Sequence, residues 1–317
     1  MHPILRVSQV SFRVTSQPIL HHIELVVGRG QIVGILGGSG CGKTTMLNLI
    51  AGIICPTLGA VSVDYDQTGE VRVEEPGPDR GIVYQAYGLY PFLTSLENVA
   101  LGPKLHCTTI PGRWLGRITG SWRRMRKQHL KDAEELLVRF GLGDAIRKYP
   151  HELSGGMRQR VAIAQALIMK PEILLLDEPF GALDEATRED LQRMLLVLYE
   201  ENLVAVREGK SAPHTILLVT HAISEAIFVG DRVVGLSRRW NWKEEGFATC
   251  PGATIVYDKI APVFKPTDPM DYTRFAAQKD EITQVVFGGD DRVRPKDGCT
   301  FWSQIHTNHG HGVTSDT

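Results

Sequence analysis

The sequence predicts an α/β fold built on a mostly parallel sheet with flanking helices, preceded by antiparallel strands and interrupted by a helical insertion. Three observations lead to this prediction. The apolar run 31–36 leads into a glycine-rich turn and then into a segment with helical spacing. Two further apolar runs, 172–177 and 215–219, are separated by a helical pattern, as parallel strands joined by a helix are. Residues from about 104 to 165 are mainly helical in pattern, which predicts the insertion.

The first half of the chain supplies most of the predicted strands. Residues 4–36 alternate short apolar segments with turn residues, and the run 31–36 is apolar almost throughout, as a strand buried on both faces is. Residues 61–84 predict further strands, broken at 76–81 by Pro-Gly-Pro-Asp-Arg-Gly. In 43–53, apolar residues recur at helical spacing: Met46, Leu47, Leu49, Ile50 and Ile53.

The second half is more helical. The clearest helix of the insertion is predicted at 127–145. After about residue 240 the patterns weaken, with strand and turn expected at 238–259, a helix at 269–287 and a disordered end at 306–317. We therefore place a domain boundary at 240, between a main domain, 1–240, whose helical subdomain covers about 96–165, and a C-terminal extension, 241–317.

Composition narrows the functional classes. The 35 Lys and Arg residues nearly balance the 36 Asp and Glu residues, so overall charge does not point to nucleic acid or an anionic membrane as the main partner. No apolar run approaches the roughly 20 residues of a membrane span, and the N-terminus lacks the pattern of a secretion signal, which favours the cytosol. The five cysteines lack C-x-x-C spacing, which favours reduced thiols over a zinc site or disulfides.

Two segments leave alternatives open. Between 113 and 131, seven Lys and Arg residues occur without an acidic residue, which fits either a patch facing lipid phosphates or an acidic partner, or an ordinary solvated helix face. Near the end of the chain, His306, His309 and His311 fit either a metal site or a flexible tail.

The glycine-rich turn, residues 37–44, has the spacing of a phosphate-binding P-loop. Gly37, Gly40 and Gly42 allow the backbone to curl around a β-phosphate with its N–H groups pointing inward. Lys43 can then reach the β- and γ-phosphates, and the Thr44 hydroxyl can bind Mg²⁺. The strand before the loop and the helix after it are the context that this motif requires.

Polar residues follow three of the predicted strands. Asp177 and Glu178 end one apolar strand, His221 ends another, and Gln85 follows the apolar residues 81–84. Ionised groups at the end of an apolar strand need a metal or a partner, so Asp177 fits a Mg²⁺ ligand and Glu178 a base that polarises the attacking water. Because open α/β sheets bind ligands at the carboxyl ends of their strands, we expect these residues to share one site with the glycine loop.

A second anion-binding device lies at 153–160, Leu-Ser-Gly-Gly-Met-Arg-Gln-Arg. Ser154, Gly155 and Gly156 precede an alternating basic and apolar run, which predicts free backbone N–H groups at a helix N-terminus. One nucleotide does not obviously need two such devices.

These motifs occur together and in order over roughly residues 7–237, and they resemble the ATP-binding subunit of an ABC transporter. The resemblance implies that ATP and Mg²⁺ are bound. It implies that nucleotide contacts come from Gly37, Gly38, Ser39, Gly40, Cys41, Gly42, Lys43, Thr44 and Thr45. It identifies Glu178 as the catalytic base, Gln85 and His221 as further catalytic residues, and Thr44, Gln85 and Asp177 as Mg²⁺ ligands.

In this family two subunits pack head to tail. The resemblance therefore implies that Ser154, Gly155 and Gly156 of one subunit close on the γ-phosphate held by another, with Asp184 also at the contact. A gapless register places Val14 where the family stacks an aromatic ring on adenine, and Phe12 is the nearest aromatic residue, so we assign Phe12 to adenine. Gly38 stands where the family commonly has Pro, and Met157 where it often has Gln.

The stretch 76–102 resembles importer subunits of the nitrate, sulfonate and taurine group. The implied partners are a second ATP-binding subunit, transmembrane permease subunits and, indirectly, a solute-binding protein, at the cytoplasmic face of the cell membrane and without nucleic acid. Tyr87, Leu89, Tyr90, Phe92 and Leu93 then suit a groove for a permease helix, although they also fit a core beneath the insertion.

Two other functional classes remain open. The first is a soluble ABC ATPase acting on nucleic acid or the ribosome, although such proteins usually carry two cassettes or a long coiled insertion. The second is a nucleotide-dependent regulator in which hydrolysis is incidental, although the presence of both Glu178 and His221 argues against it.

Overall fold

The computed structural model describes residues 2–65, 69–106, 121–181, 183–261, 271–288 and 301. The chain divides into two compact units, Met1–Pro76 with Leu195–Thr317, and Gly77–Met194. The strands are β1 (Pro3–Val14), β2 (Gln17–Gly28), β3 (Ile32–Gly37), β4 (Leu58–Val63), β5 (Val71–Arg72), β6 (Arg80–Val83), β7 (Ile173–Asp177), β8 (Thr215–Val219), β9 (Arg232–Ser237) and β10 (Thr254–Ile260). The α-helices are α1 (Lys43–Ala51), α2 (Ser95–His106), α4 (Ser121–Arg139), α5 (Gly155–Leu167), α6 (Glu185–Arg207), α7 (Ile223–Val229) and α8 (Tyr272–Ile282).

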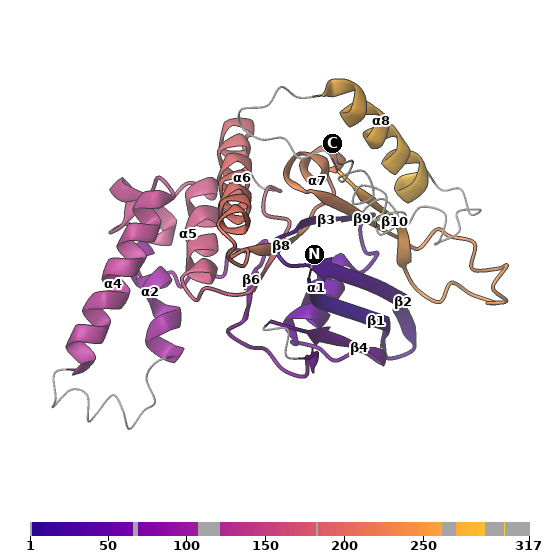
Figure 1. Ribbon diagram of the computed structural model, residues 1–317, viewed down its shortest axis with the longest axis horizontal. Helices are drawn as coiled ribbons and strands as arrows, with labels where there is room; N and C mark the ends of the chain where they lie inside the picture. The colour runs from indigo at the N-terminus through magenta and orange to yellow at the C-terminus, as the bar shows by residue number, and fades with distance from the viewer. Residues whose placement is uncertain are drawn as a thin grey trace, which may run out of the picture. The chain divides into compact units, whose positions relative to one another are not determined.

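The first unit opens with an antiparallel sheet. Strand β1 lies between β2 and β4, and β4 also pairs with β5, all antiparallel (Figure 1). Bulges interrupt the β1–β2 register, and non-glycine residues adopt positive φ at Gln9 (φ 50°) and His22 (φ 46°). The predicted antiparallel strands at the N-terminus are confirmed.

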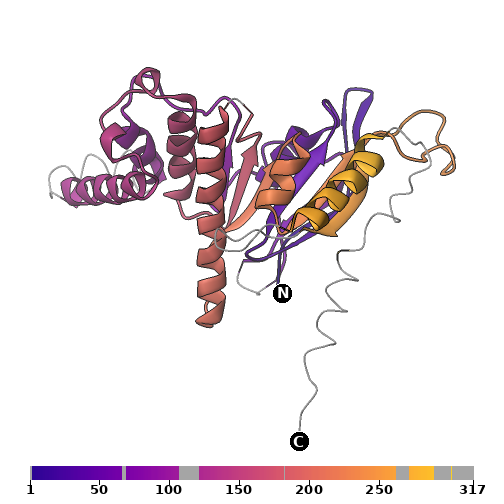
Figure 2. The same cartoon turned by 90° about the horizontal axis from the view of Figure 1, so that it is seen from above.

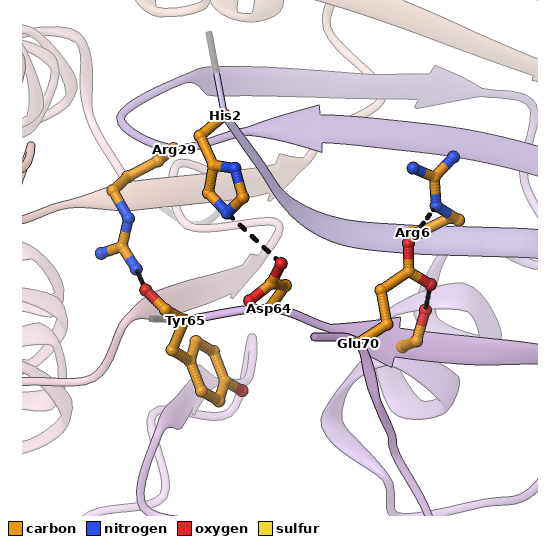
Figure 3. A network of polar contacts seen from close by, with 7 residues as sticks. His2, Arg6, Arg29, Asp64, Tyr65 and Glu70 are labelled. Carbon is orange, nitrogen blue, oxygen red and sulfur yellow. Dashed lines mark hydrogen bonds and ion pairs between the residues drawn. The ribbon is translucent and has the colours of Figure 1, made fainter. Parts of the chain in front are cut away.

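Polar side chains tie this sheet together at one end (Figure 3). Arg6 Nε donates to Glu70 Oε1 at 2.6 Å, and Ser62 Oγ donates to Glu70 Oε2 at 2.7 Å. These two hydrogen bonds hold the pKa of Glu70 below its usual value. His2 Nε2 lies 3.5 Å from Asp64 Oδ2, so polar contacts join β1 and the residue before it to the chain around and after β4.

The strand before the glycine loop lies in a second sheet of the first unit. Strand β3 is parallel to β8 on one side and to β9 on the other, and β10 adds an antiparallel strand beside β9. All residues of β3 and β8 are buried, as the apolar runs predicted. The predicted α/β class with a mostly parallel sheet is confirmed.

Helix α1 is shorter than predicted. It ends at Ala51 because Gly52 adopts a left-handed conformation (φ 78°), and its N–H bonds to the carbonyls of Asn48 and Leu49. Ile53 is 46% exposed, so its assignment to the apolar face of the helix is wrong. The periodicity of the sequence continued past a glycine that stops the helix.

The chain after residue 240 packs onto the second sheet. Residues of β10, α8 and the π-helical turn Thr283–Phe287 share an apolar cluster with Leu36 of β3 and with α7. Helices α7 and α8 lie side by side (orange and yellow in Figure 2). The predicted strand at 238–259 is β10, and the predicted helix at 269–287 is α8 with its π-helical turn. The predicted disordered end, with His306, His309 and His311, lies outside the described residues.

The second unit holds the strands β6 and β7, which are parallel, and the helices α2, α4 and α5, which pack against one another. Helix α4 ends at Arg139, and Gly141 (φ 69°) turns the chain into two short 3₁₀ turns, Gly143–Ala145 and Pro150–Glu152. The helix predicted at 127–145 therefore stops six residues early, at a glycine.

The basic segment falls partly on α4. Arg124, Arg126, Lys127 and Lys131 are exposed there, whereas Arg113, Arg117 and the side chain of Arg123 lie outside the described residues. Among the helices that the structure describes, none combines the length and the apolar character needed to cross a lipid bilayer.

Candidate functional site

The glycine loop joins the buried strand β3 to α1. A Cβ atom at Gly37 would lie 2.5 Å from the Leu236 carbonyl oxygen, and one at Gly42 would lie 2.8 Å from Leu20 Cδ2. Gly42 also has a φ of 102°. Residues of neighbouring strands thus leave no room for a side chain at either end of the loop, so both ends need glycine.

The middle of the loop is open. No atom within the described structure lies within 4 Å of a Cβ built on Gly38 or Gly40, although the φ of 72° at Gly40 still favours glycine. A Cβ at position 38, where the family that the sequence resembles commonly has Pro, would therefore meet no neighbouring atom of the described structure. Ser39 and Gly40 are exposed at the tip of the loop.

Lys43 is the buried cation of the loop. Its side chain is 7% exposed, and Nζ donates to the carbonyl oxygens of Gly37 (2.9 Å) and Gly38 (3.2 Å). These bonds hold the ammonium over the same loop whose N–H groups are predicted to meet phosphate. Beside it, Thr44 is exposed and Thr45 is half-buried.

Cys41 packs inside the loop. The residue is 4% exposed, and its N–H donates to the Gly38 carbonyl at 3.3 Å. Burial raises the pKa of the Cys41 thiol. Its side chain therefore supports the loop from within, and only its backbone is available for the predicted nucleotide contact.

His221 sits in a turn that two residues of the same unit hold. It is exposed after β8, whereas Thr220 is 1% exposed. The Thr220 hydroxyl donates to the carboxylate of Glu225 and accepts the N–H of Ala222 at 3.1 Å. Thr220 and Glu225 were not among the predicted site residues, although a polar residue directly after a buried strand was a usable signal.

In the second unit, Glu178 and Gln85 meet. Gln85 Nε2 donates to Glu178 Oε2 at 3.3 Å, and Glu178 has a left-handed backbone, with a φ of 47°. Such a conformation is unfavourable for a residue with a Cβ and often marks functional positions. Asp177, the last residue of β7, is 7% exposed, whereas Glu178 is half-buried, so the two adjacent carboxylates differ in burial.

Ser154 begins α5 as its N-cap. Its Oγ accepts the N–H of Met157 at 3.3 Å, and its carbonyl accepts the N–H of Arg158 at 3.0 Å. The first bond satisfies one of the four N–H groups that lack an intrahelical partner at the start of the helix, and the second is the first regular bond of the helix. The N–H groups of Gly155 and Gly156 belong to the same first turn. The structure thus places Ser154, Gly155 and Gly156 at a helix N-terminus, and their contact with an anion stays a prediction.

Asp184 is the N-cap of α6. Its Oδ1 accepts the N–H of Thr187 at 3.0 Å, and its Oδ2 accepts the Thr187 hydroxyl at 2.7 Å. These bonds, the hydroxyl first, lower the pKa of the exposed Asp184 carboxyl. Thr187 was not among the predicted site residues, although the spacing Asp-x-x-Thr could have identified it as part of a helix cap.

The residues predicted to stack on adenine and those predicted to contact the permease lie at the surface or near it. Phe12 is half-buried opposite Leu20, and Val14 is 55% exposed. Tyr90 is 42% and Phe92 70% exposed, so these two are surface residues rather than core. Three residues of the predicted groove are half-buried: Tyr87, Leu89 and Leu93.

The predicted site residues are distributed over the two units. The first unit carries Phe12, the glycine loop 37–45 and His221, and the second carries Gln85, 154–156, Asp177, Glu178 and Asp184. Within the described residues, no group of three or more His, Cys, Asp or Glu side chains is arranged to hold a metal ion.

Comparison with known sequences identifies related proteins. The profile of the ABC transporter family matches residues 20–181. The chain is 42% identical to a nitrate import ATP-binding protein of Synechococcus elongatus, over 68% of each chain. It is 39% identical to a taurine import ATP-binding protein of Escherichia coli O157:H7, over 74% of this chain and 80% of the relative.

A third relative is a bicarbonate transport ATP-binding protein of Synechocystis, 40% identical over 68% of this chain. The chain spans 66% of the length of that protein and 28% of a longer bicarbonate transport ATP-binding protein of Synechococcus elongatus. Among solved structures, a dimeric ATP-binding cassette bound to ADP and inorganic phosphate aligns with a TM-score of 0.60 and 27% identity, over 82% of this chain and 100% of that one.

Proposed function

The chain belongs to the ABC transporter family, and on this premise we propose that it is the ATP-hydrolysing subunit of a binding-protein-dependent importer for a small anion. The identity of 39 to 42% to ATP-binding proteins named for bicarbonate, nitrate and taurine carries this proposal. The cargo is accordingly a small oxyanion or sulfonate.

The glycine loop and Lys43 bind the phosphates of ATP. Backbone N–H groups of the loop and of the α1 N-terminus face the anion, and the ammonium of Lys43 exchanges the carbonyl oxygens of Gly37 and Gly38 for phosphate oxygens. This exchange replaces two neutral acceptors by charged ones, which strengthens each hydrogen bond.

Glu178 is the base that polarises the attacking water. The hydrogen bond from Gln85 fixes the direction of one carboxylate oxygen, so the carboxylate meets water in a defined orientation. His221, held in its turn by Thr220, contacts the γ-phosphate and completes the catalytic set.

Mg²⁺ fits the residues assigned to it. Thr44, Gln85 and Asp177 offer a hydroxyl, an amide and a carboxylate, the oxygen ligands that this ion prefers. Asp177 is a carboxylate of low exposure at the end of a buried strand, which favours a nearby cation. When bound, Mg²⁺ neutralises phosphate charge; it is usually held by one or two carboxylates, phosphates and water, so the lack of a larger ligand cluster among the described residues does not oppose it.

A second ATP-binding subunit completes the nucleotide site. The N–H groups at the start of α5 and the Ser154 hydroxyl meet the γ-phosphate bound by the other subunit, so ATP bridges the dimer and hydrolysis releases it. Two anion-binding devices in one chain are thereby explained, since each belongs to a different nucleotide.

A permease helix docks on the exposed aromatic residues after Gln85. Phe92 and Tyr90 present rings to solvent, and the Arg158 guanidinium lies 5.2 Å from the centre of the Tyr87 ring. Docking there places the chain at the cytoplasmic face of the cell membrane.

The test is mass spectrometry of proteins that co-purify with tagged Glu178→Gln from detergent-solubilised native membranes, in the presence of ATP. The matched control adds Phe92→Ser, which removes the exposed ring and leaves the nucleotide residues intact. We expect a permease and a solute-binding protein with Glu178→Gln and their loss in the control. Recovery of ribosomal proteins or nucleic acid alone would refute the importer and support a soluble ABC ATPase.

A further inference from the structure

Gly156 of α5 lies against Thr187 of α6. A Cβ atom built on Gly156 would lie 1.7 Å from Thr187 Cγ2, 3.2 Å from its Cβ and 3.7 Å from its Oγ1. No real Cβ tolerates the first distance. The glycine at 156 is therefore required by a neighbouring side chain of the same unit, whatever the nucleotide requires.

Two hydrogen bonds to Asp184 hold the side chain of Thr187 against Gly156. Its N–H and its hydroxyl both donate to Asp184, at 3.0 and 2.7 Å. Threonine has few allowed χ1 angles in a helix, and turning the methyl group away from Gly156 would carry the hydroxyl away from Asp184. A larger residue at 156 would thus break the cap of α6 or push the two helices apart.

We propose that Thr187 is a positioning residue that joins the Ser154 end of α5 and the Asp184 end of α6 into one rigid block. Its methyl group sets the distance between the helices, and its hydroxyl fixes the Asp184 carboxylate. This inference rests on the proposed function, because it assigns both helix ends to the contact with a second ATP-binding subunit.

The contact between α5 and α6 through Thr187 matters because the proposed nucleotide site is assembled from two chains. Ser154 and Asp184 must reach the partner subunit at the same time, and an error in one helix would weaken the contact made by the other. The N-terminal ends of α5 and α6 touch directly, without flexible side chains between them. This contact reduces the conformational entropy that is lost when the dimer forms.

The test uses four proteins, all carrying Glu178→Gln to retain ATP: the reference, Gly156→Ala, Thr187→Ser, and the double variant. Serine keeps the hydroxyl for Asp184 and removes Cγ2, the atom that meets a Cβ at position 156. The ATP concentration that gives half-maximal dimer is measured by size-exclusion chromatography with light scattering, and ATP binding to the monomer is measured separately.

We expect Gly156→Ala to raise this midpoint at least about tenfold, as an overpacked contact does, with monomer binding unchanged. The double variant should return to within about threefold of Thr187→Ser, because the space for the methyl group is restored. A double variant as impaired as Gly156→Ala, or an unimpaired Gly156→Ala, would overturn the proposal.

Thr187→Val tests the hydroxyl with Gly156 intact. Valine keeps a methyl group beside the glycine and cannot donate to Asp184, so we expect the midpoint to rise roughly threefold to tenfold, as for the loss of one charge-assisted hydrogen bond. An unchanged midpoint contradicts the part of the proposal that concerns Asp184, and this result is available even if Gly156→Ala does not fold.

Failure of the proposed function is recognised separately. If the reference protein itself does not dimerise with ATP, the ATP-bridged dimer is wrong. The contact is then tested by melting temperature, which Gly156→Ala should lower by roughly 3 to 9 °C and the double variant should restore.

Discussion

Gln85 Nε2 donates to Glu178 Oε2 at 3.3 Å, and this bond joins the chain after β6 to the chain after β7 within one unit. Glu178 holds its left-handed backbone beside this contact, and its carbonyl accepts the N–H of Gly181 at 3.2 Å. The strained residue is thus fixed on both its side chain and its backbone. A carboxylate held in this way is suited to orient a water molecule.

Replacing Glu178 with Gln should leave ATP binding intact and slow hydrolysis at least about a hundredfold, because an amide cannot act as a general base. Single-turnover hydrolysis and nucleotide binding are measured on the same protein. The matched control is Glu134→Gln, an exposed residue of α4, which should hydrolyse ATP at the wild-type rate. Wild-type turnover by Glu178→Gln would show that another group is the base.

Replacing Ser154 with Arg should abolish ATP-induced dimerisation while the isolated chain still binds ATP. The long side chain would cover the open N–H groups at the start of α5 and bring its own cation to the phosphate. Light scattering with and without ATP measures the dimer. Ser154→Ala is the control, since it removes the N-cap at a cost of about 1 kcal/mol without blocking the helix end. A dimer that persists in Ser154→Arg would contradict the head-to-tail arrangement.

Asp231 should make the chain less stable as pH rises. Burial raises its pKa to about 7, only partly opposed by the hydrogen bond from the Ile32 N–H. The folded state therefore binds the proton more tightly than the unfolded state, and the stability from this group is lost between about pH 4 and pH 7. A shift of about three units corresponds to roughly 4 kcal/mol at most.

Asp231→Asn keeps an oxygen that accepts the Ile32 N–H and cannot ionise. Urea unfolding should show that the variant gains stability relative to wild type between pH 5 and pH 8. The control is Asp280→Asn on the exposed side of α8, whose difference from wild type should not change over this range. A pH-independent difference for Asp231→Asn would contradict a titrating carboxyl.

Cys41 should resist alkylation in the folded protein. Its thiol is buried and its pKa is raised, whereas Cys55 is exposed, so Cys55 should react at least about tenfold faster near pH 7.5. Peptide mass spectrometry after iodoacetamide treatment distinguishes the two sites. In denaturant the two rates should converge. Equal rates in the folded protein would mean that the glycine loop opens readily.

The sequence predicted the strands and the glycine loop because their signals are local. Strand β3 is an apolar run because it is buried on both faces. The loop is rich in glycine because positive φ angles and close packing require glycine at particular positions. The sequence predicts ends for α1 and α4 that lie beyond the observed ends at Ala51 and Arg139. The apolar periodicity continues past the glycine that follows each helix.

The partners of the site residues could not be predicted in the same way. Nothing in the local sequence shows that Thr187 faces Gly156 or that Gln85 meets Glu178, since each contact depends on how distant segments pack. Residue type and motif spacing indicated which side chains to assign to the predicted site. The residues that hold them in place became visible only with the fold.

Arg232 has no exposed surface, and its guanidinium bonds to both carboxylate oxygens of Asp258, at 2.7 and 2.6 Å, and to the carbonyl of Val26 at 2.6 Å. Loss of the Asp258 carboxylate alone would leave a buried positive charge without its partner, at a cost of about 3 to 5 kcal/mol. A chain cut after residue 240 would lose both Asp258 and the strand β10, whose Ile260 pairs with Arg232. The sheet that presents the glycine loop would then fold poorly or not at all. The family profile matches 162 residues, 20–181. The chain thus needs more residues for a stable fold than those that identify its family.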